Sequence, residues 1–331
     1  MAKVKPIIFG IAGHSLTEQE RQLFLNHKVI GFILFKRNIR DKEQLTQLIQ
    51  ELKNLHLDSN PLIFIDQEGG RVARLAPPLA SKFYPPAEYF SKIYGENGKK
   101  YALEVAFDNY ASIMRDLKQF GIDSPCAPVA DLRYSYTDNV IGDRSFGEFV
   151  PKVVELCTEA IKAIQEQGGL AIIKHIPGHG RARVDSHYVL PHVSEKCEEL
   201  EKTDFEVFRQ LAKINNIWAM TAHIIFDALD PELPVTLSKK AISFIREVIG
   251  FKGILTTDAI EMGALHGEAG KQYLYALKNR AKISDQEFAE ARENYVKSIG
   301  KVAAASLAAG CDYVLHTSGD YEEMLEVLGM V

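Results

Sequence analysis

Four of the chain's ten histidines lie close together, in the stretch IIKHIPGHGRARVDSHYVLPH at residues 172–192. A proline and two glycines interrupt the apolar start of this stretch, which predicts a strand that ends in an irregular loop. On that loop Asp185 and His187 are two residues apart, so in an extended segment both side chains can face the same side. The carboxylate would then orient the imidazole and favour its protonated form, which suits a group that donates and later accepts a proton. A surface aspartate and histidine without mutual contact also fit this spacing.

A zinc site is the rival explanation for these histidines, because imidazole is a common zinc ligand. The spacing does not match the HExxH helix of zinc hydrolases, and Lys174 would place a cation beside the metal. We therefore expect no metal here.

The segment IDQEGGRVARL at residues 65–75 forms a second candidate cluster. Asp66 ends an apolar run, and a Gly-Gly turn separates it from Arg71 and Arg74. A carboxylate beside positioned guanidinium groups can bind the hydroxyl groups of a polar ligand. A salt bridge at a strand end explains the same residues equally well.

A third cluster is GILTTDAIEMGAL at residues 253–265, where Asp258 closes an apolar run. At the mouth of a barrel its carboxylate could attack an electrophilic sugar carbon. The alternative is an N-cap for a helix that begins at Ala259.

Eight short apolar runs alternate with amphipathic segments, which predicts a parallel sheet covered by helices. The runs are Ile7–Gly13, Gly31–Phe35, Pro61–Asp66, Asp123–Asp131, Gly169–His175, Ile217–His223, Gly253–Asp258 and Asp312–Thr317. Eight β/α units favour a (β/α)8 TIM barrel over a doubly wound sheet, since no glycine-rich phosphate turn follows the first run. Residues 41–55 and 150–167 are typical of the covering helices.

Polar residues stand at the carboxyl ends of these runs, where the active sites of TIM barrels lie. They are Asp66, Asp131, Lys174, His175, His223 and Asp258. A long polar segment at residues 264–301 interrupts the alternation of apolar runs and amphipathic segments. It predicts a helical insert between the seventh and eighth strands. We expect residues 1–331 to form a single catalytic domain that ends in one more helix.

The composition excludes several classes of function. A net charge of -5 leaves no basic face for a nucleic acid. No window approaches the ~20 apolar residues of a membrane span, and no secretory leader is recognised, so a cytoplasmic protein is expected. The four cysteines form no CxxC pair, which favours buried free thiols over a zinc knuckle or a disulfide framework.

Taken together, the motifs DQEGGRVARL, GDRSFG, KHIPGHG with DSH, MTAH, TTDAIEM and AGCDYVL resemble those of glycoside hydrolase family 3, specifically its bacterial β-N-acetylhexosaminidases. The resemblance implies a retaining exo-glycosidase that removes terminal β-linked N-acetylglucosamine. It places Asp258 at the nucleophile position, His187 at the acid/base position and Asp185 at the position that supports the histidine. It also implies a sugar-binding set, which consists of Asp66, Arg74, Arg144, Lys174 and His175.

The same resemblance implies no metal and no organic cofactor. The compact form is similar to cytoplasmic enzymes of peptidoglycan recycling, whose substrate is N-acetylglucosamine linked to 1,6-anhydro-N-acetylmuramic acid, with or without a peptide. We therefore expect a small carbohydrate substrate and a monomer or weak dimer. A phosphorylase that replaces water with phosphate, a broader β-glycosidase and a non-catalytic barrel that binds amino sugars are the alternatives.

Overall fold

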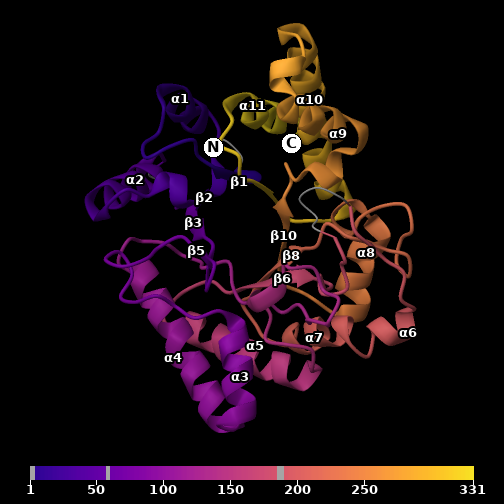
Figure 1. The fold of residues 1–331 in the computed structure, drawn as a ribbon. Coiled ribbons are helices and arrows are strands. Elements are labelled where there is room, and N and C mark those ends of the chain that lie inside the picture. Colours follow the sequence, from indigo (N-terminus) through magenta and orange to yellow (C-terminus); the bar gives the residue numbers. More distant parts are fainter. Residues whose placement is uncertain (1–3, 57–59, 185–189) are drawn as a thin grey trace.

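A parallel sheet curls around the centre of the protein in the computed structural model, which describes residues 4–56, 60–184 and 190–331 (Figure 1). Within these residues the sheet has seven strands in the order β3-β2-β1-β11-β10-β8-β6. They are β1 (Lys5–Gly10), β2 (Val29–Leu34), β3 (Leu62–Ile65), β6 (Ile172–Ile176), β8 (Trp218–Thr221), β10 (Ile254–Ala259) and β11 (Tyr313–His316). Because β1 pairs with β11, the two ends of the chain meet in the middle of the sheet.

The predicted α/β class is confirmed, and seven of the eight predicted strands form. Their sequences are runs of apolar and β-branched residues, and such runs suit strands that are covered on both faces. Two small pairs lie beside the main sheet. They are antiparallel β4 (Gln67–Gly69) with β5 (Val72–Ala73), and parallel β7 (His192–Val193) with β9 (Ile225–Phe226).

The strand predicted at residues 123–131 is wrong. Pro125 and Pro128 have no N–H group to donate to a ladder, and Cys126 has a positive φ of 48°, so the backbone cannot stay extended. The segment instead makes two isolated parallel bridges, Phe64 to Ser124 and Val129 to Lys174. It thereby occupies the place between β3 and β6, and the described residues form a seven-stranded sheet rather than eight regular strands.

Helices surround the curled sheet on its outer face (Figure 1). They are α1 (Glu18–Asn26), α2 (Lys42–Asn54), α3 (Ala87–Glu96), α4 (Lys99–Lys118), α5 (Val150–Glu166), α6 (Cys197–Leu200), α7 (Asp204–Leu211), α8 (Lys239–Phe244), α9 (Gly267–Lys278), α10 (Asp285–Ala309) and α11 (Tyr321–Met330). Short turns of other helix types are η1 (Lys36–Asn38), η2 (Gly142–Arg144), η3 (Val235–Leu237), η4 (Ile245–Ile249), η5 (Gly263–His266) and η6 (Arg280–Lys282). The helices predicted at residues 41–55 and 150–167, and the final helix, are confirmed.

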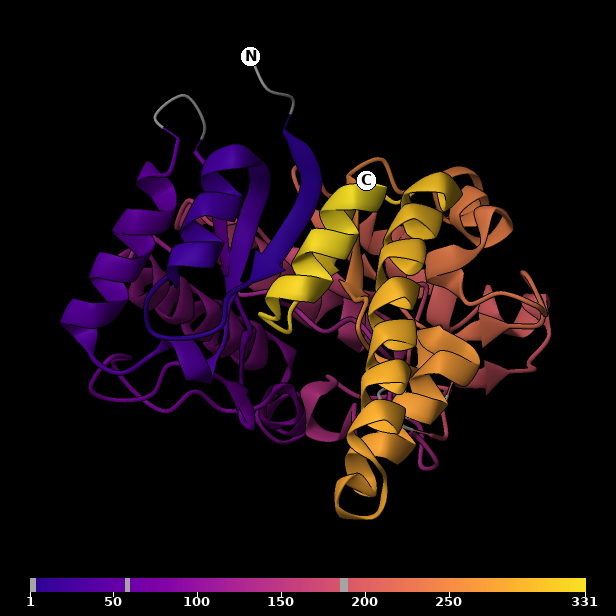
Figure 2. The same ribbon diagram turned by 90° about the horizontal axis from the view of Figure 1, so that it is seen from above.

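The predicted insert consists of two helices, α9 and α10, joined through η6. Ser284 caps α10 with a capping box that Glu287 completes, and Gly310 ends the helix with a φ of 114°. The far end of this helical pair projects beyond the body of the molecule (Figure 2). It follows β10 in the chain and therefore starts at the carboxyl end of that strand.

Two groups of buried apolar residues hold the sheet in place. The larger group lies between the sheet and its helices and includes Ile173, Phe208 and Leu255. The smaller group lies on the inner face of the curled sheet, and its members are Ile8, Ile33, Phe64, Cys126, Ile172, Met220 and Leu315. Because Ile33, Met220 and Leu315 also line the main pocket, the inner group forms its floor.

No helix in the described part of the chain is long and apolar enough to cross a membrane. The four cysteines, all of which the structure describes, are free, and Cys126, Cys157 and Cys311 are buried.

The inner group makes a first prediction. Phe64 is 1% exposed and packs against Trp218 with 5.6 Å between ring centroids. Replacing it with alanine leaves a cavity, so Phe64→Ala should lower the free energy of unfolding in urea by about 3–5 kcal/mol. Phe83→Ala is the control, because Phe83 is 79% exposed and should change stability by less than about 0.5 kcal/mol. Equal effects of the two changes would contradict the assignment of the inner core.

Candidate active site

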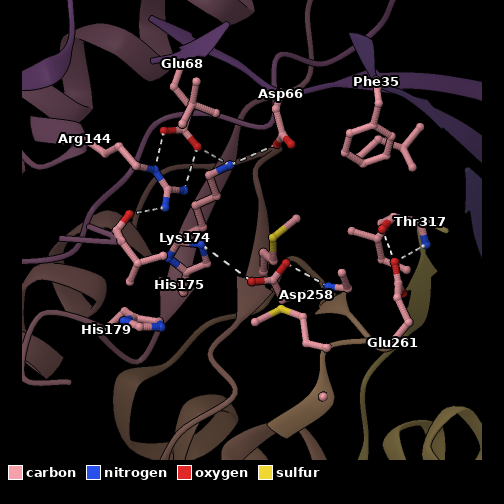
Figure 3. Close-up of a pocket in the computed structure, with 18 of the residues that line it drawn as sticks. Phe35, Asp66, Glu68, Arg144, Lys174, His175, His179, Asp258, Glu261 and Thr317 are labelled. Carbon is pink, nitrogen blue, oxygen red and sulfur yellow. Dashed lines mark hydrogen bonds and ion pairs between the residues drawn. The ribbon is translucent and has the colours of Figure 1, made fainter. Parts of the chain in front are cut away.

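A pocket of about 540 Å³ opens at the carboxyl ends of the strands. Six residues predicted for the site line it, and they are Asp66, Arg74, Arg144, Lys174, His175 and Asp258. Asp185 and His187 lie outside the described residues. The structure therefore brings together the predicted sugar-binding set and the predicted nucleophile (Figure 3).

Glu68 is the centre of the charged side of the pocket. Arg144 Nε and Nη2 donate to its two carboxylate oxygens at 2.8 Å each, and Lys174 Nζ lies 2.6 Å from Oε1. Glu68 is 5% exposed and Lys174 is 2% exposed. Burial raises the pKa of Glu68, but attraction to Arg144 and Lys174 outweighs it and holds the pKa far below its usual range. The same carboxylate raises the pKa of Lys174 against the effect of burial.

Asp66 holds the other side of this network. Lys174 Nζ donates to its Oδ1 at 3.3 Å, and Arg74 Nη2 donates to Oδ2 at 2.9 Å. The sequence IDQEGGRVARL left two alternatives open, a salt bridge at a strand end and a ligand site. The structure shows that the ion pairs of Asp66 exist and that their residues line the pocket, so both descriptions apply. Asp66 keeps 18% of its side chain exposed, so part of the carboxylate faces the cavity.

His175 links two carboxylates. Its Nδ1 lies 2.7 Å from Asp131 Oδ2, and its backbone N–H donates to Asp131 Oδ1 at 3.0 Å. Its Nε2 lies 3.7 Å from Asp258 Oδ2 (Figure 3). Burial raises the pKa of Asp131, but attraction to His175 and the hydrogen bonds leave it below the ordinary value. The ring is thereby fixed with Nε2 directed at Asp258.

Lys174 and His175 are neighbours in β6, and successive side chains of a regular strand point to opposite faces. Both side chains line the pocket, and the peptide bond that joins them is cis.

Asp258 lies inside β10, and no helix begins at Ala259, so the N-cap explanation is excluded. Ala259 N donates to its Oδ1 at 2.8 Å, and His223 Nε2 lies 3.0 Å from the Ala259 carbonyl oxygen. Burial raises the pKa of Asp258, but attraction to His175 and His223 lowers it to about 2. Its side chain keeps 23% exposure, so an ionised carboxylate at pH 7 faces the cavity.

The pocket also contains polar residues that were not among the predicted ones, including Glu68, Glu261 and Thr317. Glu68 follows Asp66 by two residues, a spacing that places both on one side of an extended segment and could have revealed it. Glu261 and Thr317 stand on the opposite wall, where the Thr317 backbone N–H donates to Glu261 Oε1 at 2.9 Å. Burial raises the pKa of Glu261. Only the fold brings these two together, because 56 positions separate them.

The start of the loop after β6 is firmly anchored. Arg181 Nε donates to Asp204 Oδ2 at 2.7 Å, and the Tyr134 hydroxyl donates to the same oxygen at 3.0 Å. The Arg181 guanidinium lies 4.6 Å from the centroid of the Tyr134 ring. Asp185 therefore follows only four residues after a buried anchor point.

Residues 4–56, 60–184 and 190–331 contain no group of three or more His, Cys, Asp or Glu side chains that could hold a metal ion. Burial and the neighbouring His175 lower the pKa of His179 to about 4.

Comparisons with known proteins identify the family. The sequence profile described as "Glycosyl hydrolase family 3 N terminal domain" matches residues 4–331. The chain belongs to glycoside hydrolase family 3, as its motifs predicted.

The chain is similar to proteins called β-hexosaminidase. That of Neisseria gonorrhoeae is 33% identical over 280 residues, which are 84% of this chain and 74% of that protein. That of Thioalkalivibrio sulfidiphilus is 31% identical over 311 residues, 94% of this chain and 80% of that protein. NagZ from Neisseria gonorrhoeae, solved in complex with N-trifluoroacetyl-D-glucosamine, superposes with a TM-score of 0.83 at 30% identity, covering 99% of this chain and 86% of that one.

The Glu68 network makes a second prediction. Glu68→Gln leaves buried Arg144 without its carboxylate partner and leaves Lys174 with Asp66 alone, so it should lower the free energy of unfolding at pH 7 by about 3–5 kcal/mol. The folded-state pKa lies below the ordinary value of 4.5, so this stabilisation is complete above that pH and is lost as the pH falls below it. Urea titrations of wild type and variant should therefore converge in acid.

Glu104→Gln is the matched control. Glu104 pairs with Lys100 at 3.9 Å on the surface, where the two side chains are 62% and 92% exposed. Its loss should change stability by less than about 1 kcal/mol at any pH. A Glu68 variant as stable as this control at pH 7 would contradict the proposed charge network.

Proposed function

We propose that the protein is a retaining, exo-acting β-N-acetylglucosaminidase. The observation that carries the proposal is Asp258, an accessible carboxylate held ionised beside a buried cluster of sugar-binding type. The membership of glycoside hydrolase family 3 and the β-hexosaminidases among its relatives support the same activity.

The charged side of the pocket would bind the terminal sugar. Asp66 offers carboxylate oxygens, and Arg74, Arg144 and Lys174 offer N–H donors, which together can hold several hydroxyl groups. Their mutual ion pairs keep them in place before substrate arrives, so little ordering is required on binding. The sugar's anomeric carbon then lies over Asp258.

Catalysis would follow a double displacement. Asp258 Oδ attacks the anomeric carbon while protonated His187 gives its proton to the leaving oxygen, and the glycosidic bond breaks. The glycosyl-enzyme ester then reacts with water, from which neutral His187 takes a proton. A histidine suits both steps because its unperturbed pKa is about 6.5.

The roles of His187 and Asp185 rest on the DSH motif and on its place in the chain. The motif follows the anchor formed by Arg181 and Asp204, so its loop starts from a fixed point close to the pocket. An acid/base on a loop can leave to admit substrate and return to the leaving oxygen. Asp185 would orient the imidazole and favour its charged form.

We infer that the curled sheet is a variant of the (β/α)8 TIM barrel, in which residues 123–131 take the place of one strand. The bridges from Phe64 to Ser124 and from Val129 to Lys174 support this. The family profile spans residues 4–331, which supports one catalytic domain within residues 1–331.

The proposed substrate in the cell is a small carbohydrate, N-acetylglucosamine linked to 1,6-anhydro-N-acetylmuramic acid with or without its peptide. Peptidoglycan recycling in the cytoplasm, by a monomer or weak dimer without a cofactor, is the corresponding role. The names of the relatives and the closeness of the NagZ fold support this assignment.

The catalytic roles can be tested with two N-acetyl-β-glucosaminides, one with a good aryl leaving group and one with a poor leaving group. Asp258→Ala should lose about 10⁴-fold or more in kcat with both substrates, because the nucleophile is removed. His187→Ala should lose about 10²–10⁴-fold with the poor leaving group. Its glycosylation step with the good leaving group should be affected far less.

Product analysis by NMR completes this test. The first product should be the β-anomer of N-acetylglucosamine, and adding phosphate should not divert it to a sugar 1-phosphate. Wild-type rates in both variants would disprove the assigned roles, and a sugar 1-phosphate as the main product would replace hydrolysis with phosphorolysis.

The electrostatics of Asp258 predict a shift in pH dependence. His175 is the largest influence that lowers the pKa of Asp258, so His175→Gln should raise that pKa from about 2 toward its ordinary value. The acid limb of kcat/KM for the activated aryl substrate should then move to higher pH by about one unit or more. Coincident acid limbs after normalisation would show that His175 does not act on the nucleophile.

A further inference from the structure

The wall of the pocket opposite the charged cluster carries Glu261 and Thr317, and its other side chains are mainly apolar or aromatic. Helix α9 builds part of this wall. Tyr273, Leu274 and Leu277 from this helix line the pocket, together with Met262 and Tyr295 from other elements. Asp258 lies between the charged cluster on one side and Glu261 with Thr317 on the other (Figure 3). A ligand that places its hydroxyl groups on the charged wall therefore extends a less polar part toward α9.

Leu274 and Leu277 have no role in the core. They are three positions apart and face the same side of α9, yet neither belongs to the two buried apolar groups of the fold. Leu277 is 46% exposed. Two leucines that face a catalytic pocket instead of the core are the composition expected of a ligand-binding surface.

The helix is held rigidly against the segment that carries the nucleophile. A Cβ atom on Gly270 would lie 2.7 Å from the Gly263 carbonyl oxygen, so α9 approaches the turn after Met262 directly, backbone to backbone. The Tyr295 hydroxyl donates to the Glu261 carbonyl oxygen at 2.5 Å, and its ring stacks on Tyr273 at 4.6 Å and 22°. The apolar wall thus has a fixed position relative to Asp258.

We propose that the apolar face of α9 is an aglycone subsite that selects leaving groups with an apolar surface, such as alkyl or aryl groups or the apolar face of a second sugar ring. Tyr273, Leu274 and Leu277 are its specificity-determining residues. This inference rests on the proposed function, because it takes the charged wall as the site of the terminal sugar. The leucines gain contact only with the group that leaves, so they set the preference between glycosides and leave the chemistry of bond cleavage to Asp258 and the acid/base.

The test compares methyl, ethyl, propyl and butyl N-acetyl-β-glucosaminides, which differ in apolar length with little change in leaving-group acidity. In the wild type, kcat/KM should rise by roughly two- to fourfold for each methylene that leaves water. Leu277→Ser, and Leu274→Ser combined with it, should flatten this rise so that the butyl-to-methyl ratio falls toward one. Leu277 is half exposed, so its replacement does not threaten folding.

Tyr275→Ser is the matched control on the same helix, because Tyr275 is 64% exposed and does not line the pocket. It should keep the wild-type butyl-to-methyl ratio. A wild type that cleaves the activated aryl substrate but treats all alkyl glycosides alike would overturn the subsite while the proposed function stands. Failure to cleave any N-acetyl-β-glucosaminide would overturn both.

The methyl group of the N-acetyl substituent is the other apolar part that could face α9. N-acetyl and N-propionyl aryl glucosaminides with one leaving group separate the two cases. The leucine variants should leave the ratio between these substrates unchanged. A changed ratio together with an unchanged alkyl series would assign the wall to the N-acyl group and overturn the aglycone subsite.

Discussion

The burial of Glu68 between Arg144 and Lys174 is the constraint on which the pocket depends. Taking charges out of water is costly, and the three groups are tolerated only because each satisfies another. The arrangement ties β6 to the segment after β3 and to η2, so side chains from three distant parts of the chain meet in one wall of the pocket. Their rigidity follows from the same balance, since displacing one removes an ion pair from a buried neighbour.

A second charged network involves the same strand, β6. His175 stands between buried Asp131 and Asp258. Asp131 orients the ring, and the ring in turn stabilises the ionised form of Asp258. Neighbouring positions in β6 therefore serve two tasks. Lys174 belongs to the network around Glu68, which is proposed to hold the sugar, and His175 belongs to the pair that lowers the pKa of Asp258.

Much of this arrangement follows from sequence pattern. Polar residues at the carboxyl ends of apolar runs correctly placed Asp66, Lys174, His175 and Asp258 in one pocket. The strand predicted at residues 123–131 was the exception. Its apolar composition favoured a strand, but Pro125 and Pro128 prevent a regular ladder of hydrogen bonds. Glu68, Glu261 and Thr317 were not predicted. The charges that compensate Glu68 and the meeting of the segments that carry Glu261 and Thr317 are properties of the folded chain, and they leave no periodic pattern in the sequence.

The backbone contact between Gly270 and Gly263 has a consequence for how such an enzyme can change. Asp258, the turn after it and α9 form one continuous piece of chain, whereas the charged cluster is assembled from other segments. With α9 as the proposed aglycone subsite, variation in the length or sequence of this insert would alter the group accepted beyond the scissile bond while the charged cluster stays intact. Recognition of the sugar and recognition of what is attached to it would then lie on separable stretches of one polypeptide.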